Sequence, residues 1–224
     1  MNGMMGGFYK VSEWIMRFSV VNLLWILFNL PIVFIVSSMF FAEESGEKII
    51  LSIPLLLLAP LLFFPSTSAL FASVRDWLLK KEGKSLVKTF WNYYRENYKK
   101  SLLGGLFLTS MWVIWVVDYY YLKEISVIFM FTFILLGVVL YVYSINFFSV
   151  LVHYDIKLRK VLKNTFLITI GSPTLFFAVF ISSGMILYIS LKGPLFLIAF
   201  FSGSLIVFLS YSAFHRLYLK LTSS

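Results

Sequence analysis

Side chains that could bind a metal, move a proton or attack a substrate are few in this chain and are not grouped. Cysteine is absent, and His153 and His215 are the two histidines, so the chain has no thiolate ligand or cysteine nucleophile, and a histidine-rich metal site is not expected. His153 and Asp155 are two positions apart and would point in different directions on a helix. No phosphate-binding glycine loop, nucleophile elbow or zinc signature is present. We therefore expect no enzyme, no metal and no cofactor.

The ten acidic residues all lie outside the middle of the apolar stretches. Ionisable groups at membrane depth mark ion pathways and catalytic sites. A transporter driven by protons or sodium would usually hold a carboxylate there, and an intramembrane carboxylate protease needs one. The sequence therefore argues against both classes.

Small polar residues do interrupt the apolar stretches. The clearest case is FFPSTSALFASVRDW, in which Pro65 is followed by Ser66, Thr67 and Ser68. The other polar or helix-breaking positions of this kind are Asn22, Asn29, Pro31, Pro54, Pro60, Asn146 and residues 171–173. One interpretation is kinked helices whose hydroxyls satisfy the carbonyls that proline leaves free. The other is broken helices that line a polar substrate path, as in transporters. We favour the structural interpretation.

The composition requires that most of these residues lie in lipid. The chain has 224 residues, of which 60% are hydrophobic and 13% charged, whereas soluble domains average about 45–50% and about 25%. Six apolar stretches come close to the roughly 20 residues that cross a bilayer. They lie at 18–41, 49–72, 102–122, 125–150, 166–190 and 194–214. We predict an all-α, polytopic transmembrane protein in which residues 1–224 form a single domain.

The positive charges predict the orientation of this domain. When the N-terminus, residues 73–101, residues 151–165 and the C-terminal tail are placed on one side, all but three of the 19 Lys and Arg residues lie there. The three exceptions are Lys48, Lys123 and Lys192. Positive residues concentrate in the cytoplasm, so both termini are predicted to be cytoplasmic. The net charge of +9 then reflects membrane sorting, and we expect no nucleic-acid partner.

This orientation can be checked with reporter fusions. Fusions after Ser45, Glu124 and Gly193 should report an external location. Fusions after Gly83, Lys160 and Ser224 should report an internal one. A C-terminus that reports outside would show that the number of spans is wrong.

The two cytoplasmic loops are basic and partly amphipathic. In SLVKTFWNYYRENYKKSL, one helical face carries Leu86, Val87, Phe90, Tyr94 and Tyr98, and basic residues occupy much of the rest. Such a helix is expected to lie among anionic lipid headgroups with its apolar face toward the membrane. The second loop, HYDIKLRKVLKN, is shorter and also basic. Because the order span, basic segment, span occurs twice, a degenerate duplication stays open.

Three segments resemble one known family. GGFYKVSEWIMRFSVVNLLWILFNLPI, FPSTSALFASVRDWL and FWNYYRENYKKS are similar to the YesL-like family of bacterial inner-membrane proteins, a domain of unknown function (family 624). The similarity covers roughly residues 6–105. The positions that it carries over are Gly7, Tyr9, Glu13, Trp14, Asn22, Trp25, Pro65, Ala69, Phe71, Arg75, Trp77, Phe90 and Tyr94.

The resemblance implies a location and a class of role. Genes of this family often lie near those of polysaccharide-degrading enzymes and sugar-uptake transporters. This implies a multi-pass protein of the bacterial cytoplasmic membrane that serves as a non-enzymatic accessory or permease-like component of carbohydrate uptake, with a sugar transporter complex as partner. The alternative is a membrane scaffold or regulator that docks a cytoplasmic partner on its basic inner loops.

We also predict how the ends of the first two spans meet. Glu13 and Arg17 lie one helical turn apart before the first span, and Arg75 lies at the inner end of the second. Since these spans are joined by only a short loop, Glu13 is expected to pair with Arg75, with Trp14 and Trp77 anchoring the pair at the headgroups. The hydroxyls of Ser66, Thr67 and Ser68 would then bond the carbonyls freed around Pro65.

Overall fold

The chain folds into helices in the computed structural model, which describes residues 4–81 and 85–223. These residues contain no strand, which confirms the all-α prediction. The elements are α1 (Met4–Phe28), α2 (Leu30–Phe41), α3 (Ser45–Leu58), the π-helical segment η1 (Ala59–Phe63), α4 (Phe64–Leu78), α5 (Leu86–Leu122), α6 (Val127–His153), α7 (Leu158–Gly171), α8 (Pro173–Lys192), α9 (Leu195–Leu197), the π-helical segment η2 (Ile198–Ser202) and α10 (Gly203–Thr222). Gly83 and Ser224, two of the proposed fusion points, lie outside the described residues.

Within residues 4–81 and 85–223, six helical segments are long and apolar enough to cross a membrane, as predicted. They run over Tyr9–Phe28, Ser45–Leu78, Leu86–Leu122, Val127–His153, Pro173–Lys192 and Leu195–Thr222. Two of these segments are continuous through a π-helical turn, because η1 joins α3 to α4 and η2 joins α9 to α10. A π turn absorbs an extra residue without ending the helix.

The prediction that residues 18–41 form one span is wrong, because this stretch contains parts of two helices. α1 ends at Phe28 and α2 begins at Leu30. Asn29 between them leaves helical geometry (φ −103°, ψ 11°), and Pro31 stands in the first turn of α2. Proline favours the start of a helix and disfavours helical geometry in the residues before it, so the hydrophobic run continues while the helix does not.

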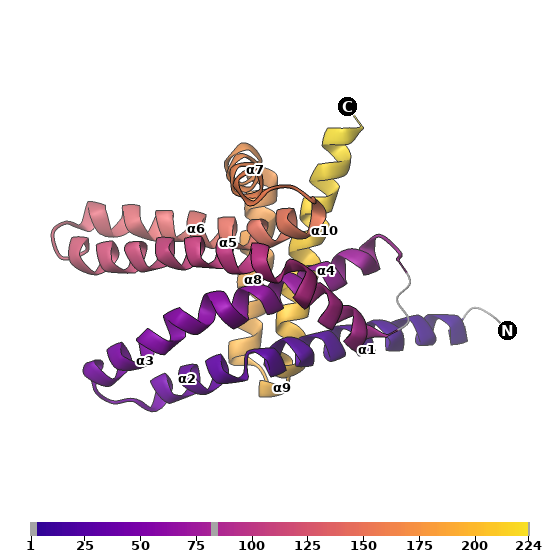
Figure 1. Cartoon of the computed structure of the whole chain (residues 1–224), viewed down its shortest axis with the longest axis horizontal. Helices are drawn as coiled ribbons and strands as arrows, with labels where there is room; N and C mark the ends of the chain where they lie inside the picture. Colours follow the sequence, from indigo (N-terminus) through magenta and orange to yellow (C-terminus); the bar gives the residue numbers. More distant parts are fainter. Residues whose placement is uncertain (1–3, 82–84, 224) are drawn as a thin grey trace.

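The fifth stretch, predicted over 166–190, is interrupted in the same way. α7 ends at Gly171, Ser172 leaves helical geometry (φ −126°, ψ 87°), and α8 begins at Pro173. α7 is seen end-on in Figure 1, whereas α8 runs in the plane of the view. The span therefore starts seven residues later than predicted, and residues 166–171 belong to the basic helix before it.

The first basic loop continues without a break into the helix of the third span. α5 runs without a break over 37 residues, from Leu86 to Leu122. The predicted amphipathic helix is present, but the expectation that its apolar face lies free on lipid is wrong at Phe90. That side chain is fully buried and its ring lies 5.5 Å from the ring of Phe28.

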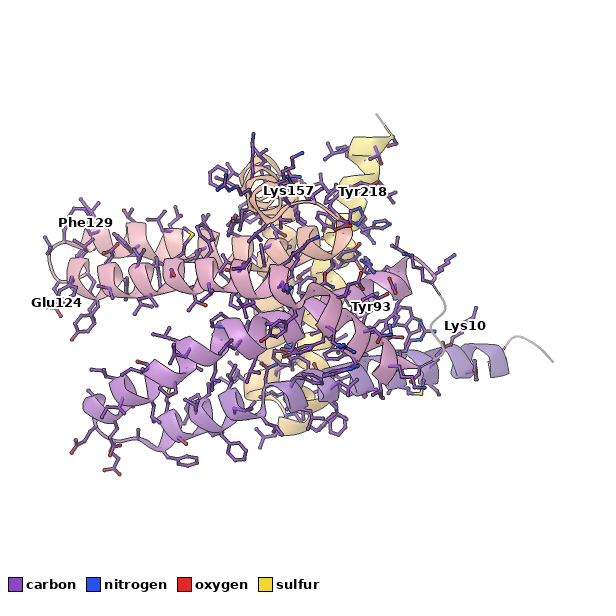
Figure 2. All side chains as sticks on the ribbon, in the orientation of Figure 1. Lys10, Tyr93, Glu124, Phe129, Lys157 and Tyr218 are labelled. Carbon is purple, nitrogen blue, oxygen red and sulfur yellow. The ribbon has the colours of Figure 1, made fainter. Side chains whose placement is uncertain are left out.

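The hairpins do not share one axis. In Figure 1 the α5–α6 hairpin lies roughly parallel to α1–α2, while α8 and α10 run steeply across both. Figure 2 places Glu124 at the tip of α5–α6 and Lys10, Tyr93 and Tyr218 toward the other end. A helix that is tilted from the bilayer normal needs more residues to cross than an upright one. The 34 residues of Ser45–Leu78 and the 37 of α5 provide that length.

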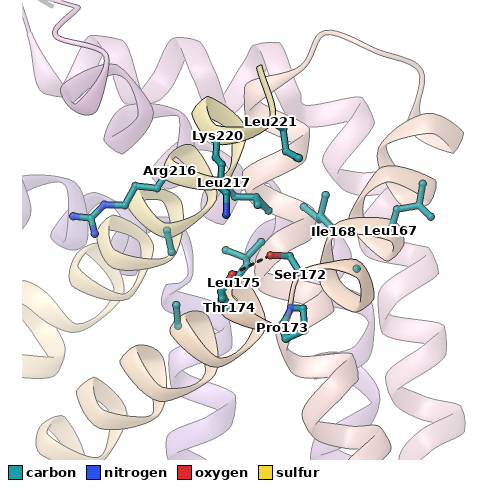
Figure 3. A pocket seen from close by; sticks show the side chains of 13 residues that line it. Leu167, Ile168, Ser172, Pro173, Thr174, Leu175, Arg216, Leu217, Lys220 and Leu221 are labelled. Atoms are coloured by element: carbon teal, nitrogen blue, oxygen red, sulfur yellow. Dashed lines mark hydrogen bonds between the residues drawn. The ribbon is translucent and has the colours of Figure 1, made fainter. Parts of the chain in front are cut away.

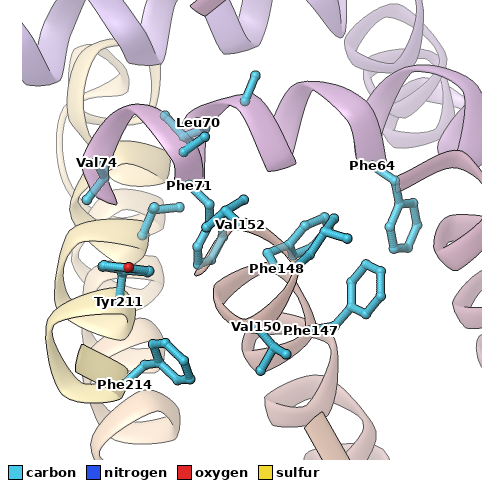
Figure 4. Close-up of a cluster of buried hydrophobic side chains, with 14 of the residues drawn as sticks. Phe64, Leu70, Phe71, Val74, Phe147, Phe148, Val150, Val152, Tyr211 and Phe214 are labelled. Carbon is cyan, nitrogen blue, oxygen red and sulfur yellow. The ribbon is translucent and has the colours of Figure 1, made fainter. Parts of the chain in front are cut away.

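The core lies where the crossing helices meet (Figure 4), between α4, α6 and α10. Almost every residue of α4 is buried, which makes it the central helix. Phe71 of α4 stacks on Phe148 of α6 with ring centroids 5.4 Å apart, and Tyr211 of α10 is fully buried beside them. Small residues let helices approach closely in membranes, and α4 supplies Ser66, Ser68, Ala69, Ala72 and Ser73.

Two adjacent glycines let α5 approach the core. A Cβ atom on Gly104 would lie 2.2 Å from the ring of Phe147, and one on Gly105 would lie 2.6 Å from Cγ of Phe64. Both phenylalanines are buried. The ring of Phe64 must then move as a whole to admit any side chain at Gly105.

We therefore expect Gly105→Val to lower the free energy of unfolding by about 1–3 kcal/mol, the usual cost of overpacking. Gly184→Ala is the matched control, because no atom lies within 4 Å of a Cβ there. This variant should be neutral or stabilising by up to about 1 kcal/mol, since alanine favours the helix. Thermal unfolding in detergent measures both. Equal stability of Gly105→Val and the wild type would show that α4 and α5 pack differently.

Candidate functional site

The predicted ion pair between Glu13 and Arg75 is wrong. Glu13 instead accepts a hydrogen bond from Arg17 one turn along α1, and Arg75 pairs with its neighbour Asp76. The expected proximity of α1 and the end of α4 is confirmed, whereas the anchoring of the tryptophans at the headgroups stays a prediction. Trp14 and Trp77 pack edge to face with ring centroids 6.2 Å apart.

Arg75, Asp76 and Tyr93 form a cluster at the C-terminal end of α4, which we call the inner ion cluster because the charge pattern predicts that this end faces the cytoplasm. Nε and Nη2 of Arg75 both donate to Oδ1 of Asp76, at 3.1 and 3.0 Å. The hydroxyl of Tyr93, on α5, donates to Oδ2 of the same carboxylate. Both oxygens of Asp76 are therefore bonded, and the side chains of Arg75 and Asp76 are only 19% and 12% exposed.

Arg75 also reaches a third helix. Its Nη1 donates to the backbone carbonyl of Val152, which lies in the last turn of α6. The last four carbonyls of a helix have no partner within it, and a cation also complements the negative end of the helix dipole. The inner ion cluster thus joins three helices, because the guanidinium group of Arg75 bonds α6 and the carboxylate of Asp76 bonds α5.

The end of α4 is positioned by its own backbone. Beyond Leu78 the chain turns through Lys80 in the left-handed region (φ 55°), and the N–H groups of Lys80 and Lys81 donate to the carbonyls of Trp77 and Asp76. This is the arrangement that closes a helix C-terminus when one residue is left-handed. It fixes the turn from which Arg75 and Asp76 extend.

Aromatic side chains from α6 and α10 lie beside the inner ion cluster. Nδ1 of His153 lies 2.8 Å from the hydroxyl of Tyr211. The ring of His153 also packs against those of Phe214 and Tyr218, with centroids 5.3 and 4.3 Å away. The polar groups at this end are therefore enclosed by rings on the α10 side.

His153 and Asp155 do not form a pair, in agreement with the sequence-based expectation. Asp155 lies in the segment after α6 and accepts a hydrogen bond from Nζ of Lys100 on α5. That hydrogen bond and the charge of Lys100 lower the pKa of Asp155. The carboxylate is almost fully exposed, so this contact is a surface ion pair between α5 and the loop before α7.

A second polar region follows α1 deeper in the molecule, and we call it the α1 seam; it consists of Asn22, Trp25 and Asn29. Nδ2 of Asn22 donates to the carbonyls of Ile198 and Ala199 in η2, at 3.0 and 2.6 Å. Its Oδ1 accepts from the backbone N–H of Ser204, at 3.0 Å. One buried amide therefore bonds three backbone groups around the π-helical turn that precedes α10.

The other two members of the α1 seam bond α4. Nε1 of Trp25 donates to Oγ1 of Thr67 at 3.0 Å, and Nδ2 of Asn29 donates to Oγ of Ser66 at 2.7 Å. Asn29 is 2% exposed. Its Oδ1 has no hydrogen-bond partner among the described residues. The seam thus connects the first span to both helices that contain π-helical turns.

The prediction for the hydroxyls after Pro65 is confirmed for two of the three. Ser66 donates to the carbonyls of Leu62 and Phe63 in η1, and Ser68 donates to the carbonyl of Pro65. Thr67 is used differently, because its hydroxyl accepts from Trp25. All three residues are buried. The stretch that interrupts the second span is therefore a packed helix junction.

Phe90 and Tyr94 hold the other side of α1. Their rings lie 5.5 and 4.7 Å from that of Phe28, the last residue of α1. Trp91 stacks on Tyr94 at 5.8 Å. The aromatic face of α5 therefore packs against the last turn of α1, just before α1 ends at Phe28.

Sequence reasoning missed Asp76, Tyr93 and Tyr211 as members of the site. Asp76 could have been identified from the sequence, because a carboxylate at the end of an apolar stretch needs a partner and Arg75 is adjacent to it. Tyr93 and Tyr211 carried none, because aromatic residues make up 20% of the chain and any of them could have faced lipid. Their roles depend on how α5 and α10 pack against α4.

The hydrogen bonds of the inner ion cluster and the α1 seam mainly connect neighbouring helices. The described residues contain no group of three His, Asp or Glu side chains that could hold a metal ion. The polar groups of the inner ion cluster and the α1 seam are mostly bonded to one another or to backbone.

Comparisons with known proteins give one family and several relatives. Residues 18–119 match the model of "Protein of unknown function, DUF624". The chain is 29% identical to the uncharacterized protein YteU of Bacillus subtilis (strain 168) over 178 residues, 76% of this chain and 67% of YteU. It is 25% identical to the uncharacterized protein YesL of the same organism over 221 residues, 94% of this chain and 91% of YesL. No solved structure matches.

Proposed function

We propose that this chain, which matches the DUF624 model over residues 18–119 and is similar to YteU and YesL, is a non-enzymatic accessory or permease-like component of carbohydrate uptake. Its described residues contain six helices apolar enough to cross a membrane. It would act in the bacterial cytoplasmic membrane with both termini inside. The link to carbohydrate comes from the family resemblance of the three segments described above. The structure supports the accessory class of role.

The observation that carries this proposal is how the polar groups within the helices are used. In the inner ion cluster and the α1 seam, charged and amide groups bond neighbouring helices, with Arg75 alone contacting α4, α5 and α6. A permease that moved sugar by itself would need a polar path whose groups are free to bind substrate. Two cavities lie instead between helices away from these groups, one between α7, α8 and α10 and one between α5, α6 and α7. The chain is therefore better suited to support another transporter than to replace it.

The test is affinity purification of the tagged chain from native membranes in a mild detergent. We expect a sugar transporter subunit or its ATPase to co-purify. The variant Arg75→Met, which disturbs the inner ion cluster, should lose that partner if it still accumulates. A strain lacking the chain should take up the transported oligosaccharide more slowly, with the transporter itself still present. Undiminished uptake in that strain would contradict the proposal.

A second candidate function is a scaffold that docks a cytoplasmic partner. The observation that favours it is the row of exposed basic residues on the cytoplasmic half of α5 and on α7, namely Lys88, Arg95, Lys99, Arg159 and Lys160. These cations could equally contact the anionic headgroups of the inner leaflet, which attract basic segments at roughly 1 kcal/mol per residue. Co-purification of a signalling or envelope protein without any transporter subunit would support the scaffold.

A further inference from the structure

A cavity of about 730 Å³ lies where α7, α8 and α10 meet. Its walls are mostly apolar and are formed by Leu167, Ile168, Leu175, Ala178, Ala213 and Leu217. Its polar groups come from the α7–α8 junction, at Ser172 and Thr174, and from the last two turns of α10, at Arg216 and Lys220. The cavity is therefore amphipathic, with an apolar body and cationic groups on α10.

The side chains at the polar end are arranged around an open position. Figure 3 shows the ammonium group of Lys220 pointing into the cavity toward Ser172 and Thr174. The hydroxyls of those two residues lie 3.3 Å apart. Arg216 lies one turn earlier on α10 at the rim, and its guanidinium group points away from them. A different side-chain rotamer would be needed to bring this second cation to the same position.

No ion pair among the described residues involves either cation. The three ion pairs among the described residues are Glu13–Arg17, Arg75–Asp76 and Lys100–Asp155, and none of them involves α10. Both cations are exposed at the edge of a largely apolar cavity, where they can attract an anion by direct charge interaction. The hydroxyls of Ser172 and Thr174 can donate to such an anion, and the positive end of the α8 dipole adds to the attraction.

We propose that this cavity binds one anionic glycerophospholipid. Its phosphate would lie between Lys220 and the hydroxyls of Ser172 and Thr174, with Arg216 closing over it. One acyl chain would run along the apolar walls of α7 and α10. A free phosphate would use only the polar end, whereas a lipid uses both parts of the cavity. The volume falls within the roughly 300–1,000 Å³ of small-molecule sites.

This inference goes beyond the proposed function, which requires no lipid at this position. The same surface belongs to the side that the charge distribution places in the cytoplasm, where anionic lipids attract basic residues. A lipid bound here would contact the helices on both sides of Ser172, where α7 ends and α8 begins.

The test is lipid titration of the full-length chain in neutral detergent, followed by native mass spectrometry. The probes are phosphatidylglycerol, phosphatidylcholine and soluble glycerol phosphate. We expect one tightly held phosphatidylglycerol, weaker binding of phosphatidylcholine and no competition by glycerol phosphate. Removing both cations, with Arg216→Ala and Lys220→Ala, should weaken phosphatidylglycerol binding about 30-fold, which corresponds to two charges at roughly 1 kcal/mol each.

Two further variants separate the site from general charge and from misfolding. Lys88→Ala with Arg95→Ala removes the same charge from exposed positions of α5 and should bind phosphatidylglycerol normally. Ala178→Phe keeps both cations but fills the apolar wall, and it should also lose the lipid. Equal loss in the α5 control, or unchanged binding after both α10 substitutions, would overturn the proposal. Full competition by glycerol phosphate would overturn the proposal that a lipid binds, because it would show a site for phosphate alone.

Discussion

Arg75→Met is expected to destabilise the protein by about 3–5 kcal/mol, the usual cost of removing one partner from a buried ion pair. Asp76 would keep its charge at 12% side-chain exposure, with only the hydroxyl of Tyr93 left to bond it. The carbonyl of Val152 at the end of α6 would lose its donor as well. For a chain of this size the midpoint of thermal unfolding should fall by roughly 10 °C, measured in detergent by circular dichroism.

The control for Arg75→Met is Glu13→Gln, which breaks the more exposed pair on α1. The side chains of Arg17 and Glu13 are 29% and 33% exposed, so this change should cost less than about 1 kcal/mol. A double-mutant cycle with Asp76→Asn then measures the coupling between Arg75 and Asp76. If Arg75→Met were no worse than Glu13→Gln, the inner ion cluster would not be what joins α4, α5 and α6.

Asn22→Ala is expected to have the second largest effect. Asn22 is fully buried and bonds the carbonyls of Ile198 and Ala199 and the N–H of Ser204. In a π-helical turn such carbonyls lie out of the regular helical ladder, and each buried group left without a partner costs about 1–3 kcal/mol. We therefore expect a loss of several kcal/mol and easier opening of the helix around η2.

Amide hydrogen exchange can locate this effect. In Asn22→Ala, exchange should accelerate around residues 198–204 more than in α6. Asn92→Ala serves as the matched control, because Asn92 is an exposed asparagine on α5 and its loss should leave exchange unchanged. Acceleration spread evenly over all helices would indicate general destabilisation and would contradict a specific bond between α1 and η2.

The spans could be predicted from the sequence because hydropathy alone decides which segments enter lipid. The places where helices end inside an apolar stretch were harder. At Asn29 and Ser172 the hydrophobic run continues, and the signal is the proline that follows within two residues. Pro60 and Pro65 are also preceded by apolar residues, yet the helix there continues through η1 into α4. A proline in an apolar stretch therefore marks a position where a helix can end. Tertiary packing decides whether it ends there or continues through a π-helical turn.

The candidate site could be predicted only in part. The residue types that join helices were identifiable, since Asn22, Trp25 and the hydroxyls after Pro65 are polar groups in apolar surroundings. Their partners were not, because η2 lies far from α1 in sequence and nothing in the sequence sets its distance from Asn22. The partner of Arg75 was misassigned for a related reason. Proximity of helix ends suggested Glu13, while the adjacent Asp76 satisfies the same guanidinium without any movement of the backbone.

The account depends most on six crossings with both termini in the cytoplasm, and cysteine labelling of intact cells tests this directly. The chain contains no cysteine, so each single substitution can be read without background. Lys192 is preferred to Gly193 for the last outer loop, because a Cβ on Gly193 would lie 2.6 Å from the carbonyl oxygen of Ile189. We predict that a membrane-impermeant maleimide labels Ser45→Cys, Glu124→Cys and Lys192→Cys, and labels Lys160→Cys and Ser223→Cys only after the cells are opened. Protection of Lys192→Cys in intact cells would contradict the account, because α8 and α10 would then not cross the membrane.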